Sequence, residues 1–324
     1  MTRTRYWAEA QKNTLRGTFT RSSGSTDPST IGSLLMWLDA SDSSTITSAY
    51  RALTSTVTGT SGLSTLTCSG DESKTVFANM TIKVNNSEIY TVGSVATSVG
   101  ITTITTSTPL TASYAAKAIA TLGISQWNDK SGNSNNATQG TGASQPTYYP
   151  AALNSKNVLT FDGNDSLTLP SSVYSLANGA NTIFVVANTT IDNTEQRLVS
   201  LTETGSMRCG IEFVIATDSA TYQTRTSYAG LALTGITKSN YNILTGSYNG
   251  ATTQSFSLNN GTAVTNANGA LENGVNAANI GSGGASRFLT GGIAEIIIFN
   301  RALLSAEILS VNQYLSAKWN IAIS

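Results

Sequence analysis

The last thirty-four residues place the strongest constraint on the fold of this chain. Gly291-Gly292 opens onto residues 293–299, a run of β-branched and aromatic residues that predicts a strand buried on nearly both faces. Asn300-Arg301-Ala302 then interrupts the strand. The chain must therefore supply a second layer on each side of this strand.

A short helix is predicted directly after this turn. Ser305 can cap the helix, and Glu307 in the first turn would lie near the positive end of the helix dipole. Apolar residues then recur at helical spacing, namely Ile308, Val311, Leu315 and Trp319. One face of the helix must consequently pack on a neighbouring element.

This strand, turn and helix resemble the end of laminin-G-like, concanavalin A-like jelly rolls. In that family a Gly-x-Ala-Glu strand leads into an Asn-Arg-Ala-Leu turn, and the helix ends in Tyr-Leu and Lys-Trp, here Tyr314-Leu315 and Lys318-Trp319. Other segments match earlier family motifs: residues 35–42 (LMWLDASD), 127–133 (WNDKSGN), 136–139 (NATQ) and 158–165 (VLTFDGND). The resemblance covers residues 31–47 and 124–322. It implies an all-β sandwich with a short C-terminal helix, on a scaffold that binds more often than it catalyses.

Composition agrees with such a fold and excludes several function classes. Only 11% of the 324 residues are charged, and Ser, Thr, Asn and Gly replace the missing charge, which favours short strands and polar turns. The net charge is zero, which argues against a nucleic-acid partner. No apolar run has membrane-spanning length, and the N-terminus lacks the apolar core of a signal peptide. Cys68 and Cys209 are far apart in sequence and are interpreted as packing residues.

Residues 50–122 depart from the family pattern, which joins its first two motifs by a short connection. Apolar residues alternate through 76–84, 89–92 and 101–104, with a turn expected at Asn85-Asn86. We expect a small β barrel with its own core, similar to barrels of phage virion proteins. An elaborated surface hairpin of the jelly roll is the alternative. The predicted domains are an N-terminal arm (1–30), the jelly roll (31–49 and 123–324) and the insert (50–122).

Catalytic chemistry finds little support in the sequence. The absence of histidine excludes Ser-His-Asp and Cys-His arrangements and His-ligated zinc sites. Glycoside hydrolysis needs only two carboxylates, but no Glu-x-Asp-x-x-Glu strand is present. We interpret Glu295 as a structural carboxylate bonded to backbone at a sheet rim. The prediction is a protein that is not an enzyme and needs no cofactor.

Calcium is the one ion that the loops could hold. Asp129 with Asn133, and Asp162 with Asn164 and Asp165, offer oxygen ligands on turns. The same residues stabilise turns without a metal, and we favour that interpretation.

Sugar binding requires exposed aromatic rings among amides and hydroxyls. The candidates in or near predicted loops are Tyr148, Tyr149, Tyr222 and Tyr228. Packing of these tyrosines over the sandwich edge is the alternative. Trp37, Trp127 and Trp319 fall inside the family motifs and are expected in the core.

The N-terminal arm combines positive charge with aromatic residues. Its candidate anchoring residues are Arg3, Arg5, Tyr6, Trp7, Lys12 and Arg16. The aromatic pair favours an anchor that orders on a partner over a free tail.

The resemblances together predict a non-enzymatic phage virion surface protein, either a capsid decoration or a tail or fibre component. It would be assembled in the host cytoplasm, anchored to other virion proteins by its arm, homo-oligomeric, and able to bind host-surface glycans. Two alternatives remain open: a free carbohydrate-binding lectin domain, and a polysaccharide-degrading glycoside hydrolase with an unrecognised carboxylate pair.

Overall fold

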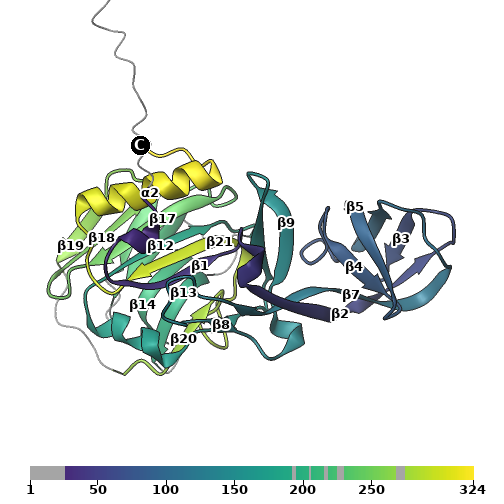
Figure 1. Cartoon of the computed structure of the whole chain (residues 1–324), viewed down its shortest axis with the longest axis horizontal. Coiled ribbons are helices and arrows are strands. Elements are labelled where there is room, and N and C mark those ends of the chain that lie inside the picture. The colour runs from purple at the N-terminus through teal and green to yellow at the C-terminus, as the bar shows by residue number, and fades with distance from the viewer. Residues whose placement is uncertain (1–25, 192–194, 204–205, 215–217, 225–229, 268–273) are drawn as a thin grey trace, which may run out of the picture.

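The structure is a computed structural model that describes residues 26–191, 195–203, 206–214, 218–224, 230–267 and 274–324. Its strand pairings are all antiparallel, and one α-helix lies near the C-terminus (Figure 1). The predicted all-β sandwich with an inserted small barrel and a C-terminal helix is confirmed.

One layer of the sandwich holds the strand predicted from the C-terminal motif. Its strands in pairing order are β9 (Thr147–Leu153), β10 (Lys156–Asp162), β21 (Thr290–Phe299), β12 (Asn181–Ala187), β17 (Asn242–Tyr248), β18 (Thr253–Leu258) and β19 (Val264–Ala267). Strand β1 (Leu34–Asp39) pairs with β21 on the same side as β10 and farther along it. Strand β21 is therefore central, and all ten of its residues are buried.

The second layer packs face to face on the first. Its strands in pairing order are β8 (Ala137–Thr138), β11 (Leu167–Thr168), β20 (Ala277–Ile280), β13 (Gln196–Glu203), β14 (Ser206–Val214), β15 (Ser219–Gln223) and β16 (Leu231–Thr234). Alternate residues of both layers meet in one apolar core, as in other sandwiches. Trp127 and Cys209 lie in this core, as expected from the sequence.

Helix α2 (Ser305–Trp319) covers the outer face of the first layer (Figure 1). Val311, Leu315 and Trp319 pack there on the face of β21 opposite to the sandwich core. The predicted cap is corrected in one detail. Leu304, rather than Ser305, is the residue before the first turn, and its backbone N–H donates to Glu307 at 2.8 Å. Among the described residues, no helix is long and apolar enough to cross a membrane.

The insert forms a separate body at the end of a two-stranded ribbon (Figure 1). Its strands are β2 (Ile46–Gly59), β3 (Thr65–Cys68), β4 (Thr81–Val84), β5 (Glu88–Ser98), β6 (Ile101–Thr106) and β7 (Tyr114–Trp127). The pairings run β2–β3–β6–β5–β4–β7 and return to β2, which closes a barrel. Its apolar core shares no residue with the sandwich cores. Asn85 and Asn86 both have positive φ, as the predicted turn requires.

Candidate functional site

The family motifs meet in a buried charged cluster between β21 and α2. Glu295 is 1% exposed. One of its carboxylate oxygens accepts the indole N–H of Trp37 at 2.7 Å and the hydroxyl of Tyr314 at 3.1 Å. The other accepts the indole N–H of Trp319 at 2.6 Å and lies 2.9 Å from the Lys318 ammonium. Burial raises the pKa of Glu295, and Lys318 opposes that rise.

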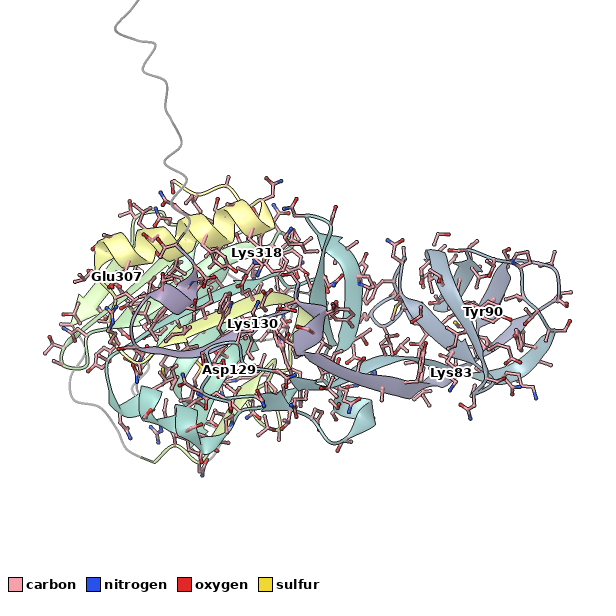
Figure 2. The ribbon with its side chains drawn as sticks, in the orientation of Figure 1. Lys83, Tyr90, Asp129, Lys130, Glu307 and Lys318 are labelled. Carbon is pink, nitrogen blue, oxygen red and sulfur yellow. The ribbon has the colours of Figure 1, made fainter. Side chains whose placement is uncertain are left out.

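Asp39 extends this cluster to the loop after β7. Its carboxylate lies 2.6 Å from the Lys318 ammonium and 2.9 Å from that of Lys130. Lys130 also contacts Asp42 at 3.0 Å and lies over the Trp37 ring, 4.6 Å from its centroid. Burial alone would raise the pKa of Asp39, but the two lysines hold it below its ordinary value. Figure 2 shows both lysines on the sandwich side of the molecule, Lys318 at the helix.

The contacts of Glu295 differ from those expected from the sequence. Glu295 was expected to accept backbone hydrogen bonds at a sheet rim; instead it is enclosed, and its partners are side chains from β1 and α2. Burial between two layers, rather than position at a rim, explains the difference, since a buried carboxylate needs compensating donors.

Both carboxylate oxygens of the calcium candidate Asp129 already accept hydrogen bonds from the protein. One carboxylate oxygen accepts the backbone N–H groups of Trp37 and Ser131, each at 2.8 Å. The other accepts the Ser131 hydroxyl at 2.7 Å and the Asn135 backbone N–H at 2.9 Å. These contacts support the turn interpretation. In the part of the chain that the structure describes, no cluster of three or more Asp, Glu or Cys residues is arranged to hold a metal ion.

The other calcium candidates, Asp162 and Asp165, contact one another at the end of β10. Asp165 is fully buried, and one of its oxygens accepts the backbone N–H of Asp162 at 3.0 Å. Its other oxygen has no hydrogen-bond partner among the described residues. Burial and the neighbouring Asp162 raise the pKa of Asp165 to about 8, against the opposing charge of Arg51.

The predicted sugar-contacting tyrosines are separated by the structure. Tyr222 is fully buried in the sandwich core, where its hydroxyl donates to Asn181 at 2.7 Å. The expectation that Tyr222 is accessible is wrong. Tyr222 lies in strand β15 rather than in a loop, and its side chain points into the core. Tyr148 is half-buried and packs against the same core, as the alternative interpretation proposed. Tyr228 and the arm residues Arg3, Arg5, Tyr6, Trp7, Lys12 and Arg16 lie outside the described residues.

Tyr149 differs from the other candidates because it reaches the barrel. Its ring stacks on Phe77 with the centroids 4.3 Å apart and an angle of 14° between the ring planes. Phe77 belongs to the loop that precedes β4, whereas Tyr149 lies on β9. The stacked pair therefore joins the barrel to the sandwich.

Beside this pair lies a cavity of about 370 Å³, which we call the junction cavity. Its size falls within the range of small-molecule sites. Its lining residues are Ser73, Lys74, Phe77, Tyr149, Ala152, Thr160, Phe161, Asn188, Thr190, Ile191, Tyr241, Thr290, Gly291 and Gly292. The barrel supplies the first three and the sandwich supplies the rest. Among these described lining residues none is Asp or Glu, and Lys74 carries the only charge.

The two glycines that open β21 shape the cavity floor. A Cβ atom on Gly292 would collide with the Tyr241 hydroxyl, and one on Gly291 would collide with the carbonyl of Asn188. The Asn188 side chain is fixed by accepting the Gly292 N–H at 2.8 Å and donating to the Ser239 carbonyl at 3.1 Å. From the sequence, the Gly-Gly pair predicts only the opening of a strand, and no local pattern marks Phe77, Asn188 or Tyr241 as site residues. The Gly-Gly pair was the one available signal of a close approach here.

The comparisons with known proteins are limited to structure. No protein-family model matches the chain, and no curated protein matches its sequence. Trypanosoma rangeli sialidase in complex with sialic acid is 15% identical, with a TM-score of 0.47 over 60% of this chain and 31% of that chain. Ruminococcus gnavus IT-sialidase CBM40 bound to alpha2,3 sialyllactose is 16% identical, with a TM-score of 0.40 over 48% of this chain and 96% of that chain. The chain thus spans less than a third of the length of the sialidase that it matches.

Proposed function

We propose that this protein is a non-catalytic glycan-binding protein whose sugar site is the junction cavity. The observation that carries the proposal is the stacked pair Tyr149 and Phe77 in the cavity wall, with Tyr241 also lining it. Aromatic faces pack against the C–H faces of sugar rings, and the amide and hydroxyl groups of Asn188 and Thr160 can bind sugar hydroxyls. A largely apolar cavity with a few polar groups suits this ligand class.

The binding role is favoured over hydrolysis by the state of the carboxylates. A glycoside hydrolase needs two carboxyl groups on either side of the scissile bond. Glu295 and Asp39 are buried and paired with Lys318, and Asp165 is enclosed. The junction cavity is lined by no Asp or Glu among the described residues. Asp71, Glu72 and Asp162 line a neighbouring hollow, where Glu72 accepts the Thr75 hydroxyl and Asp162 lies 3.8 Å from Arg51. We therefore expect no release of new reducing ends when the protein is incubated with a bound oligosaccharide.

Replacing Tyr149 by alanine should lower glycan affinity at least about tenfold, because it removes one sugar-stacking ring and the support for Phe77. A glycan array would identify ligands, and isothermal titration calorimetry would compare the variants on the tightest one. Tyr149→Phe should keep most of the affinity, since the ring is retained. Tyr174→Ala, which removes a half-buried tyrosine that does not line the cavity, is the matched control. An array with no bound glycan, or equal affinities for wild type and Tyr149→Ala, would contradict the proposal.

The setting that we propose for this binding is a virion surface, with residues 1–28 as the attachment to other virion proteins. Its support is the basic and aromatic sequence of that segment, together with the resemblance of the barrel to those of phage virion proteins. Deleting residues 1–28 should prevent incorporation into particles while glycan affinity stays unchanged. Particle assembly assays with the truncated chain measure this. Normal incorporation of the truncated chain would show instead that the attachment lies elsewhere, whereas a free lectin would not enter particles even with residues 1–28 present.

A further inference from the structure

We infer that the ligand is an uncharged oligosaccharide that runs from the junction cavity into a second, polar hollow. This inference rests on the proposed function and names its ligand class. The second hollow, which we call the polar hollow, has a volume of about 290 Å³. It is lined by Arg51, Ala52, Leu53, Thr54, Asp71, Glu72, Lys74, Thr75, Ala143, Asp162 and Asn164.

The two hollows lie next to one another along one seam between barrel and sandwich. Lys74 lines both of them. On the barrel side, residues 71–75 and Phe77 each line one or both hollows. On the sandwich side, residues 160–162 and Asn164 each line one of them. Because each segment passes from one hollow to the next within a few residues, a chain of linked sugars can occupy both.

Unused hydrogen-bonding groups in the polar hollow indicate what it binds. Arg51 is only 8% exposed; its Nη2 donates to the Thr147 hydroxyl at 2.9 Å, and the same nitrogen lies 3.8 Å from the Asp162 carboxylate. Its Nε has no hydrogen-bond partner within the described chain, and an unsatisfied buried donor is costly. Asn164 is exposed, and its amide group makes no hydrogen bond to any described residue. The hollow thus presents the exposed Asn164 amide, which can both donate and accept, beside the largely buried Arg51 side chain.

The charges around the hollow favour hydroxyl groups over an ionic ligand. Arg51 and Lys74 lie with three acidic residues, Asp71, Glu72 and Asp162, so the lining mixes both signs and carries one more negative group than positive. Glu72 is already occupied by the Thr75 hydroxyl. A sugar hydroxyl can donate to a carboxylate and accept from a guanidinium or ammonium group in the same place. This mixed lining complements the aromatic wall of the junction cavity, where sugar rings would stack.

The test varies the length of the glycan. Using the monosaccharide and the tetrasaccharide of the tightest neutral glycan, calorimetry on the full chain should show at least about tenfold tighter binding of the tetrasaccharide. Asn164→Ala should lower tetrasaccharide affinity about fivefold and leave the monosaccharide unchanged, because one hydrogen bond in the polar hollow is lost. Asn178→Ala, an exposed asparagine that lines neither hollow, is the matched control.

The outcomes separate this inference from the function on which it rests. Equal affinities for the two glycan lengths would contradict binding in the polar hollow, and so would an Asn164→Ala loss of the same size for both. Either result would leave the Tyr149-dependent binding in the junction cavity intact. Tighter binding of a uronic acid tetrasaccharide than of its neutral counterpart would also overturn the inference. Failure of every glycan to bind would remove both proposals together.

Discussion

Glu295→Ala is expected to destabilise the protein by about 3–5 kcal/mol, the range measured when one partner of a buried charge pair is removed. After the substitution, Asp39 is the one remaining carboxylate that contacts the Lys318 ammonium among the described residues. The indole N–H groups of Trp37 and Trp319 stay buried and lose their acceptor. Unsatisfied buried donors carry their full desolvation cost. Urea unfolding followed by circular dichroism measures the change.

Two further variants test why Glu295 matters. In Glu295→Gln the amide nitrogen must face donors on one side, either Trp319 and Lys318 or Trp37 and Tyr314, so most of the destabilisation should remain. Glu88→Ala, at an incompletely buried position in the barrel, should cost less than about 1 kcal/mol. If Glu295→Ala were equally mild, the cluster would not stabilise the packing of α2 on the sheet.

The elements at the C-terminus were predictable because their signals are local. A run rich in β-branched and aromatic residues predicts a buried strand, and apolar residues at helical spacing predict the packed face of α2. The partners of Glu295 were not predictable in this way. Trp37 is 258 residues away in sequence, and its approach depends on the pairing of β1 with β21. The motifs identified the fold, whereas the contacts between motifs required the structure.

In the candidate site, too, the local features were predictable from the sequence and the contacts between distant segments were not. Tyr149 was found from sequence as an aromatic residue in polar surroundings, but its partner Phe77 looked like a core residue of the barrel. Their stacking depends on how the ribbon of β2 and β7 places the barrel beside β9, which no periodicity encodes. Tyr222 was misassigned because a single tyrosine carries no local sign of the strand face on which it lies. Its burial follows from the inward face of β15.

Removing the barrel is expected to abolish glycan binding while the sandwich still folds. Ala52 and Ala120 face one another in the β2–β7 ribbon, so a short turn between them can replace residues 53–119. The buried barrel core lies entirely within that stretch, and neither sandwich core uses it. The excised protein should therefore keep a cooperative thermal transition and its β-sheet circular dichroism.

Binding should be lost because the excision removes Ser73, Lys74 and Phe77, which form the barrel side of the junction cavity. Calorimetry with the tetrasaccharide would compare this protein with the milder Phe77→Ala, which opens the stacked wall and should weaken binding about tenfold. An excised protein that binds as tightly as the full chain would place the sugar site on the sandwich alone. Complete loss in a folded sandwich, with partial loss in Phe77→Ala, would mean that the insert exists to build the binding site, because neither body encloses a ligand by itself.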